Sequence, residues 1–318
     1  MPFFVSTHGD LKIIQSFSDK VLNWYDINGR KNLPWQGHNS YHVWVSEIML
    51  QQTQVVKVID YFNNFILHFP TLESLAQAKN EEVLSQWSGL GYYNRARNLH
   101  TTAQICLEKY NGILPNNLNQ LMQLPGIGKT TAGAILSLAS DLPHPILDGN
   151  VKRVMSRVFA IRDEKISQYN LKLWQIVTDL MPQKKCRQYN QALMDLGSMV
   201  CKRSNPDCKI CPLINLCKAF RNDQINFYPQ ANKKTKQLNK TYHLLLITYN
   251  NKLVLQKREK SGIWPQLWFL PIFESKSELE SSNLLNSTNS NCYSSFSIQH
   301  ILTHRKLDLQ VHCYQNNT

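Results

Sequence analysis

The segment Leu124–Leu136 constrains the fold of this chain more than any other stretch, because it sets two closely spaced glycines between helix-forming residues. Pro125-Gly126-Ile127-Gly128 therefore predicts a hairpin between two helices. Both glycines allow left-handed backbone angles and leave the neighbouring N–H groups uncovered. A helix starting near Lys129 would present free N–H groups and a partial positive charge, which suits a phosphate. A bare Gly-x-Gly is more often a packing turn. Here the following helix, the adjacent cation and the basic chain favour a helix-hairpin-helix that grips a nucleic-acid backbone.

The charge of the chain indicates the same kind of partner. Lys and Arg number 35 against 22 Asp and Glu, which leaves a net charge of +13. Such a balance favours a polyanion, and nucleic acid over a membrane, because the longest apolar runs, such as Leu244–Ile247, are far too short to span one. The first 20 residues lack the pattern of a signal peptide. We therefore expect a cytoplasmic protein, associated with the nucleoid through DNA, whose eight cysteines do not form disulfides.

One acidic residue stands in an apolar helix. From about Tyr41, apolar residues run almost all round a predicted helix, and Glu47 lies in its middle. A carboxyl group among apolar neighbours loses hydration, so its pKa rises and it can hold a proton near neutral pH. The alternative is a Glu on the one solvated stripe of the helix. The following amide-rich patch, Gln51–Gln54, suits hydrogen bonds to base edges, although it is equally typical of a polar helix end.

Two further segments carry candidate binding or catalytic residues. Gly89–Leu99 combines glycines, two tyrosines and two arginines, a pattern typical of contact with nucleic acid or of an aromatic helix start packed on the core. Asp148 precedes a predicted helix, so it is either a simple N-cap or a carboxylate that the helix terminus keeps ionised. One carboxyl pushed toward neutral and another held charged form the pattern of an acid and an electrostatic partner. That Glu47 and Asp148 converge is a hypothesis at this point.

Four cysteines within 17 residues predict a metal centre. Their spacing is Cys-x6-Cys-x2-Cys-x5-Cys, and thiols so close together in a reducing compartment are typical metal ligands. Zinc is one candidate, but zinc sites usually pair two separate Cys-x2–4-Cys knuckles. The single compact wrap favours a cubane [4Fe-4S] cluster. The cysteines are Cys201, Cys208, Cys211 and Cys217.

Together these motifs resemble the helix-hairpin-helix DNA glycosylases, a superfamily that includes endonuclease III. Within it, Leu33-Pro-Trp-Gln36, Ser46–Gln54 and Leu90–Tyr93 resemble the MutY family of adenine DNA glycosylases, and the resemblance runs from about Phe17 to Tyr228. It implies that Glu47 is the general acid and Asp148 the stabiliser of an oxocarbenium ion, with Asn150 and Thr130 beside them. It also implies that the four cysteines hold a [4Fe-4S] cluster. The DNA-binding residues that it implies are Arg30, Trp35, Leu50, Gln51, Gln52, Tyr92, Gly126, Gly128, Lys129, Thr303 and His304.

The resemblance also implies a domain organisation. We expect a mainly α region over residues 1–228, made of a six-helix barrel module (about 36–142) and a cluster module (1–35 and 143–228). Residues 229–241 read as a linker, and residues 242–318 as a small α+β Nudix-like domain that recognises 8-oxoguanine. In that domain, Tyr242–Lys257 predicts a hairpin about an Asn-Asn turn, and Ser275–Ser297 predicts a surface loop. The acidic hydrolase signature of Nudix enzymes is missing, and the domain is shorter than is usual in the family.

The sequence therefore predicts an enzyme that removes adenine mispaired with 8-oxoguanine or guanine from double-stranded DNA. It would extrude the base and cleave the N-glycosidic bond with acid assistance. We expect a monomer with no membrane partner. Two other functions fit the same motifs: a bifunctional glycosylase with lyase activity, of the endonuclease III type, and a non-catalytic protein that binds DNA lesions.

Overall fold

The computed structural model describes residues 8–163, 165–230, 237–249, 252–286, 291–302 and 305–315. The chain divides into two compact units, residues 1–231 and 232–318. The first unit is helical and the second contains the strands, which confirms the mainly α fold with a small α+β domain. None of the helices in the described ranges is both long and apolar enough to cross a membrane.

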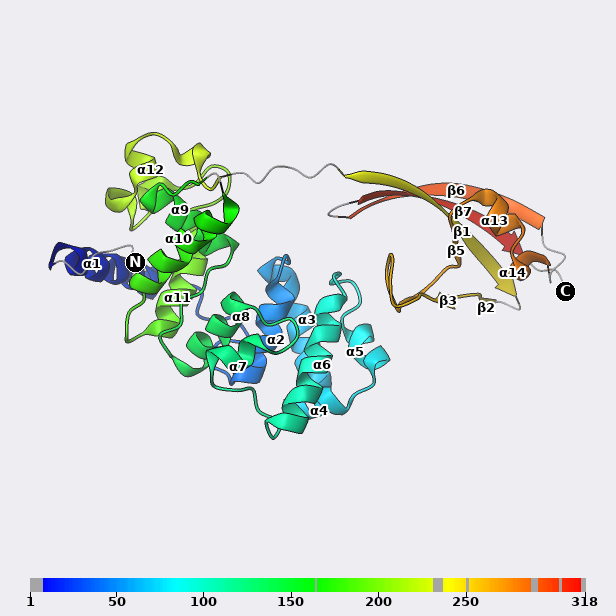
Figure 1. The fold of residues 1–318 in the computed structure, drawn as a ribbon, viewed down its shortest axis with the longest axis horizontal. Helices are drawn as coiled ribbons and strands as arrows, with labels where there is room; N and C mark the ends of the chain where they lie inside the picture. The colour runs from blue at the N-terminus through cyan, green and yellow to red at the C-terminus, as the bar shows by residue number, and fades with distance from the viewer. Residues whose placement is uncertain are drawn as a thin grey trace. The chain divides into compact units, whose positions relative to one another are not determined.

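The first unit is a succession of short helices (Figure 1). Its elements are α1 (His8–Asn28), α2 (Ser40–Leu50), α3 (Val55–His68), α4 (Leu72–Gln77), α5 (Asn80–Gln86), α6 (Asn94–Lys109), α7 (Leu118–Met122), α8 (Lys129–Ala134), η1 (Ile135–Ala139), α9 (Gly149–Phe159), α10 (Ile166–Asp179), α11 (Cys186–Asp195), η2 (Leu196–Val200), η3 (Cys208–Ile210), η4 (Ile214–Leu216), α12 (Lys218–Arg221) and η5 (Ile225–Phe227).

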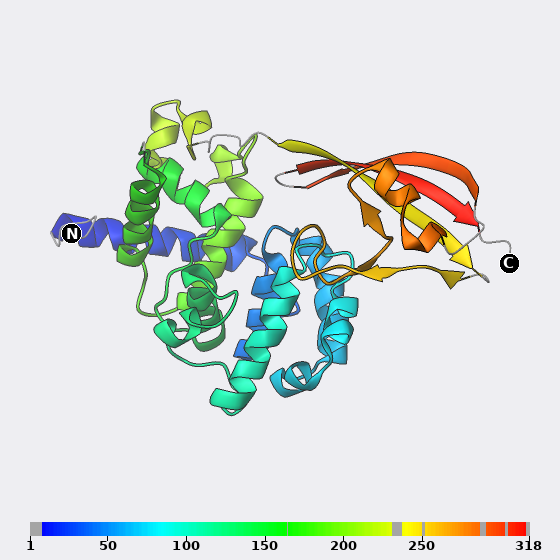
Figure 2. The ribbon, with the colours of Figure 1, turned by 45° about the vertical axis from the view of Figure 1, so that its right-hand side comes forward.

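The start of the chain packs against its later helices. Figures 1 and 2 show α1 beside α11, and the two helices are in contact. A single apolar core joins α1 to α9, α10 and α11 and reaches the cysteine-rich loop through Leu213. A second, smaller core joins α2 to η1, through Val43, Ala134 and Leu138. The two ends of the unit thus share one core, while α2 is fixed to the helix that follows the glycine hairpin.

The hairpin between α7 and α8 uses its two glycines differently. Gly126 has a φ of +78°, and a Cβ there would lie 2.9 Å from the Cβ of Asn98. Gly128 is extended, with a φ of −91°, and a Cβ there would meet no atom within 4 Å. Gly126 thus uses the left-handed backbone that a glycine allows, whereas Gly128 does not. The missing side chain of Gly128 leaves the start of α8 open, as expected.

Two π-helical segments interrupt the helices next to the candidate residues. One is η1, which continues α8, and the other is η2, which continues α11 and ends beside Cys201. Such wide turns often occur at functional sites, because they leave carbonyl groups available for other donors. In η2 the Gly197 carbonyl accepts a hydrogen bond from Arg153 (2.7 Å).

The second unit is built on a curved sheet with a short helix against it (Figure 2). Its order is β2-β1-β7-β6, with β5 also paired to β1, and β3 and β4 form a separate ribbon. Strands β1 and β7 run parallel, while β6 and β7 are antiparallel. The elements are β1 (Leu238–Tyr249), β2 (Lys252–Leu253), β3 (Gln256–Lys257), β4 (Trp268–Phe269), β5 (Ile272–Phe273), α13 (Lys276–Glu280), α14 (Asn283–Asn286), β6 (Asn291–Ile301) and β7 (Arg305–Gln315).

Several expectations for this unit need correction. Strand β1 begins at Leu238, inside the expected linker, and its hairpin partner β2 has only two residues, while Gln256 and Lys257 pair with β4. The expected surface loop 275–297 instead contains α13, α14 and most of β6. The sequence did contain a helix-start signal for α13, namely Ser275 followed three residues later by Glu278. In the structure the Ser275 hydroxyl accepts from the backbone N–H of Glu278 (3.2 Å) as the N-cap.

Strand β6 lies at the edge of the sheet and pairs on one side only within the described residues. Its 11 residues include no Lys, Arg, Asp or Glu. Several of its apolar side chains face solvent: Phe296 is 47% exposed, Ile298 48% and Ile301 67%. The edge strand β6 therefore presents apolar side chains to solvent.

Candidate active site

Glu47 occupies the apolar face of α2 that the sequence predicted. Its neighbours Trp44, Val45 and Ile48 are buried in the core. Glu47 itself is half-buried, and the loss of hydration of its carboxyl group among these neighbours raises its pKa to about 8. The negative charge of Asp148 raises it further in the same direction. This raised pKa favours the protonated form of Glu47 at neutral pH.

Asp148 is the N-cap of α9, and several groups stabilise its charge. Its Oδ1 accepts from the Val151 N–H (2.7 Å) and its Oδ2 from the Asn150 side-chain amide (3.0 Å). These bonds and the nearby Arg153 lower the pKa of Asp148, but its burial has the larger effect and raises the pKa above the ordinary value. The expectation that the helix terminus keeps this carboxyl charged thus needs a correction. Burial raises the pKa of Asp148, and the hydrogen bonds to the carboxylate offset only part of this rise.

Glu47 and Asp148 lie 101 positions apart in the chain, yet the pKa of Glu47 responds to the charge of Asp148. Because such an effect requires proximity, the structure brings the two acids together. The loop before Asp148 is held by Asn190 of α11, which is 1% exposed. Its amide donates to the His144 carbonyl (2.9 Å), and its oxygen accepts from the Ile146 N–H (3.2 Å).

A chain of hydrogen bonds connects Asp148 to the cysteine-rich loop. The Asn150 amide donates to Asp148, and its oxygen accepts from the Arg153 guanidinium (2.9 Å). Arg153 also donates from Nε to the Cys201 carbonyl (2.7 Å). The sequence predicted a role for Asn150 but none for Arg153. No local signal could have indicated the link of Arg153 to the cysteine-rich loop, because the carbonyls of Gly197 and Cys201 lie more than 40 residues later in the chain.

A pocket of about 330 Å³ opens beside helix α2. Val43 lines it, and Glu47 follows Val43 by one turn on the same face. The buried Trp35 also lines this pocket and packs edge-on against Phe62 (5.4 Å between ring centroids). Volumes of this size are typical of small-molecule sites. The other lining residues are Tyr25, Asp26, Lys31, Gln36, Gly37, Leu138, Arg187, Gln188 and Gln191.

Arg30 belongs to the loop that leads to Trp35, and its guanidinium is engaged within the protein. It pairs with the fully buried Asp195, through Nε at 2.9 Å, and the Arg30 backbone N–H donates to the same carboxylate (2.7 Å). Gln191 donates to Asp195 as well (2.9 Å). Arg30 therefore fixes the loop against α11, a role that sequence reasoning did not anticipate, since it placed Arg30 on DNA.

The residues predicted to contact bases lie on two loops. Gln51 and Gln52 follow Leu50 at the end of α2, and Tyr92 precedes α6. Gln52 and Tyr92 both have left-handed backbones, with φ of 58° and 50°. Gln52 is exposed and Tyr92 is 49% exposed, whereas Leu50 and Gln51 are partly buried. Two exposed side chains on strained backbone are typical of residues held for a function.

The start of α8 places Lys129 and Thr130 differently. The Lys129 ammonium lies over the Trp174 ring, 4.3 Å from its centroid. The Thr130 hydroxyl donates to the Leu147 carbonyl (3.3 Å), next to Asp148 in the chain. Thr130 therefore lies beside the loop that carries Asp148, whereas the Lys129 ammonium is held against α10.

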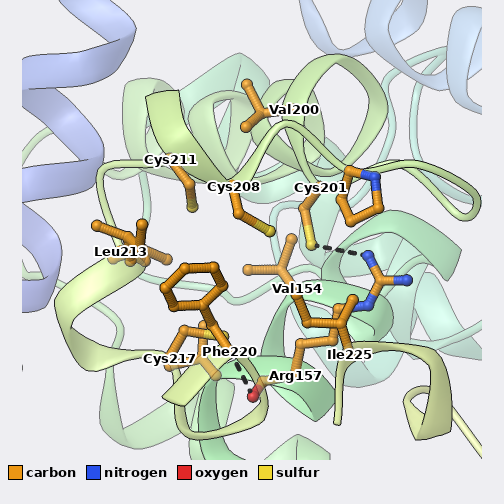
Figure 3. Close-up of a pocket in the computed structure, with 13 residues that line it drawn as sticks. Val154, Arg157, Val200, Cys201, Cys208, Cys211, Leu213, Cys217, Phe220 and Ile225 are labelled. Atoms are coloured by element: carbon orange, nitrogen blue, oxygen red, sulfur yellow. Dashed lines mark hydrogen bonds between the residues drawn. The ribbon is translucent and has the colours of Figure 1, made fainter. Parts of the chain in front are cut away.

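The four predicted ligand cysteines line one cavity (Figure 3). Apolar side chains such as Phe220 line the same cavity, and an Arg157 N–H donates to the Cys201 sulfur (3.4 Å). Burial raises the pKa of Cys208 and Cys217, and that of Cys211 to about 12, so these thiols hold their protons unless a metal displaces them. In the described ranges, no three His, Cys, Asp or Glu side chains converge as ligands of one metal ion.

Thr303 and His304, the residues predicted to meet 8-oxoguanine, lie outside the described residues. Strand β6 ends at Ile301 and β7 begins at Arg305, and the Leu302 N–H donates to the Arg305 carbonyl (2.7 Å).

Comparisons with known proteins agree with this architecture. The HhH-GPD superfamily of base excision DNA repair proteins matches residues 45–178, and the NUDIX domain matches residues 242–318. An adenine DNA glycosylase of Buchnera aphidicola subsp. Acyrthosiphon pisum (strain APS) is 46% identical over 267 residues, which are 82% of this chain and 75% of that protein. The adenine DNA glycosylase of Rattus norvegicus is 42% identical over 67% of this chain and 43% of its own length.

Solved structures share the fold of the first unit. A thermostable thymine-DNA glycosylase is 27% identical with a TM-score of 0.61, covering 67% of this chain and 98% of its own. The endonuclease III of a non-covalent DNA complex is 23% identical with a TM-score of 0.56, covering 67% and 97%. The second likeness concerns the fold alone.

The raised pKa of Glu47 predicts a pH-dependent stability cost. Unfolded chains ionise this residue near 4.5, whereas the folded protein holds the proton until about pH 8. Stability due to this group is therefore complete below pH 4.5 and is lost as the pH rises toward 8, by up to about 1.4 kcal/mol per pH unit. In urea unfolding, we expect Glu47→Gln to be increasingly more stable than the parent from pH 4.5 to pH 8. The exposed Glu108→Gln is the control, and an advantage of Glu47→Gln that stays constant with pH would contradict the prediction.

Proposed function

The chain belongs to the adenine DNA glycosylases, within the HhH-GPD superfamily of base excision DNA repair proteins, and we propose that it removes adenine paired with 8-oxoguanine or guanine. It is thus a DNA glycosylase. The observation that carries the proposed chemistry is the pair formed by Glu47, whose pKa is about 8, and the nearby Asp148. One acid then holds a proton at neutral pH while the other accepts hydrogen bonds that stabilise its charge.

The first step that we propose is extrusion of adenine from the duplex, because a stacked base cannot reach Glu47. Gln52 and Tyr92, exposed on neighbouring loops, would enter the base stack and fill the space left by the base. The pocket lined by Trp35 and Val43 is the proposed receptor for adenine, since it lies one turn from Glu47 and combines aromatic walls with polar groups. Gly126, Gly128 and the start of α8 would hold a backbone phosphate.

The chemical step needs one proton and one negative charge. Glu47 would protonate the adenine ring, so that the base leaves as a neutral molecule while the N-glycosidic bond breaks. The electron deficiency then lies on the sugar as an oxocarbenium ion, and ionised Asp148 would stabilise it. Addition of water to the sugar completes hydrolysis and leaves an abasic site. Asn150 holds the Asp148 carboxylate in place for this step.

We propose that the enzyme is monofunctional and cleaves no DNA strand. A lyase needs an unprotonated amine that attacks the sugar carbon. Thr130 stands at the position of that amine in lyase members of the superfamily, and a hydroxyl cannot form a Schiff base. The neighbouring Lys129 packs on Trp174 instead. These observations disfavour the alternative of an endonuclease III-like lyase.

The four cysteines fit a [4Fe-4S] cluster by their chemistry. They surround one cavity, the rest of its wall is mostly apolar, and Arg157 supplies a positive charge beside Cys201. In the described residues the four cysteines do not converge on one ion position. A cubane would suit such a set better than zinc, because its cysteines bind different irons, whereas four zinc ligands bind one ion. When bound, the cluster would cross-link the loop, whose Cys201 carbonyl holds Arg153.

We propose that the second unit reads the base opposite adenine. It matches the NUDIX domain, and its sequence includes Thr303 and His304, whose side chains can hydrogen-bond to a base. The partner is thus double-stranded DNA, on which we propose that the protein acts as a monomer in the cytoplasm.

Glu47→Gln should abolish excision and preserve binding. The amide keeps the shape of the side chain but delivers no proton, so the single-turnover rate on A:8-oxoguanine and A:G duplexes should fall about 10²- to 10⁴-fold. The parent rate should decline above about pH 8, as Glu47 loses its proton. The exposed Glu108→Gln is the control and should keep the parent rate. If Glu47→Gln excised adenine at the parent rate, the assignment of the acid would be wrong.

Incubation with an A:8-oxoguanine duplex should yield an abasic product in which both DNA strands remain intact. Borohydride should trap no stoichiometric protein–DNA adduct, because Thr130 supplies no amine. A trapped adduct would contradict the monofunctional mechanism, and its loss in Lys129→Ala would identify the amine responsible.

Protein prepared without oxygen should contain about four iron and four sulfide per chain and absorb as an iron–sulfur protein. Substituting Cys211 by Ser should release the iron and lower the melting temperature, while Cys106→Ser, at a cysteine outside the cavity, should keep the iron. Stoichiometric zinc in the parent protein would overturn the assignment of the cluster.

A further inference from the structure

The guanidinium of Arg95, at the start of α6, binds two loops at once. From one side it donates to carbonyls at the end of α2, and from the other to carbonyls before Tyr92. It also lies within 3.4 Å of the Thr53 hydroxyl through both terminal nitrogens. The carbonyl oxygens are those of Ile48 (2.9 Å), Met49 (2.9 Å), Gln51 (2.6 Å), Leu90 (3.3 Å) and Gly91 (3.1 Å).

These hydrogen bonds satisfy carbonyl groups at the C-terminus of α2. The last carbonyls of a helix lack partners within it and carry partial negative charge, which a cation stabilises. Because Arg95 binds three of these carbonyls, the chain can leave the helix sharply at Gln52, whose φ is 58°. The carbonyls of Leu90 and Gly91 likewise precede Tyr92, whose φ is 50°. A left-handed backbone costs a non-glycine residue about 1–3 kcal/mol, so both positions need support from their surroundings.

Aromatic rings confine the same guanidinium. Its carbon lies 5.4 Å from the ring centroid of Trp87 and 5.4 Å from that of Tyr92. Trp87 is fully buried and donates from its indole N–H to the Gly91 carbonyl (3.2 Å). Lys57 of α3 holds the adjacent Gly89 carbonyl (2.7 Å). Arg95 thus has a fixed position relative to the core, and both loops are fixed relative to Arg95.

We propose that Arg95 is a positioning residue for base extrusion: it sets Gln52 and Tyr92 at the spacing that lets both side chains enter the base stack together. This inference rests on the proposed function. Arg95 acts through the two loops and takes no part in proton transfer. Lysine cannot replace it, because an ammonium group has three donors from one point, whereas the planar guanidinium reaches both loops with separate nitrogens.

The test uses 2-aminopurine, a fluorescent adenine analogue, placed opposite guanine in a duplex. All variants carry Glu47→Gln, so that binding and extrusion are observed without excision. In the Glu47→Gln protein, binding should raise the fluorescence as the analogue leaves the stack. Adding Arg95→Lys should abolish most of this rise at saturating protein, while adding Lys109→Met, which removes an exposed charge at the far end of α6, should leave it unchanged.

A kinetic measurement with native Glu47 separates positioning from general damage. On an A:G duplex, Arg95→Lys should slow single-turnover excision roughly 10- to 100-fold. On a single-nucleotide bulge, where adenine is already unpaired, the loss should be less than about threefold. In a Gln52→Ala/Tyr92→Ala background, Arg95→Lys should have no further effect on the duplex, because residues that act through one another are not additive.

The outcomes distinguish this inference from the proposed function. Three outcomes would overturn the positioning role of Arg95 and leave the proposed function standing. They are equal losses of rate on duplex and bulge, an undiminished fluorescence rise in Arg95→Lys, and a further slowing in the Gln52→Ala/Tyr92→Ala background. If the protein with native Arg95 neither raised the fluorescence nor excised adenine from either substrate, the proposed function would fail and the role of Arg95 with it.

Discussion

The structure depends on keeping two acidic side chains together in a partly buried site. Each carboxyl group loses hydration, and the charge on Asp148 disfavours a second charge on Glu47. Burial and repulsion therefore both favour a proton on Glu47. Neither α2 nor α9 could maintain this arrangement alone. It requires the apolar contact between α2 and η1, the Asn190 bonds to the loop before Asp148, and the N-terminus of α9.

Arginine side chains hold the segments that surround this pair. Arg153 joins the Asp148 region to the cysteine-rich loop, Arg30 joins the Trp35 loop to Asp195, and Arg95 joins the two loops that carry Gln52 and Tyr92. In each case the planar group donates in several directions to groups distant in sequence. Part of the high positive charge of the chain is therefore used inside the protein.

The sequence predicted the helical fold and the two acids, because the apolar surroundings of Glu47 and the position of Asp148 before a helix are local patterns. It also singled out Asn150. It could not predict the partners of Arg95, Arg153 and Asn190, since a bond to a backbone carbonyl leaves no trace in the identity of the accepting residue. Strand β6 was missed for a related reason: three of its 11 residues are Ser, and it is a strand because β7 supplies its hydrogen bonds.

The edge strand β6 bears on how the protein behaves in concentrated solution. Soluble proteins usually protect a long sheet edge with charged residues, proline or a covering segment, because an unprotected edge accepts a strand from another molecule. In the described residues, β6 has none of the charges or prolines and exposes Phe296, Ile298 and Ile301 along its length. The smaller unit therefore carries a sheet edge at which another molecule could pair, whatever the thermodynamic stability of the helical unit.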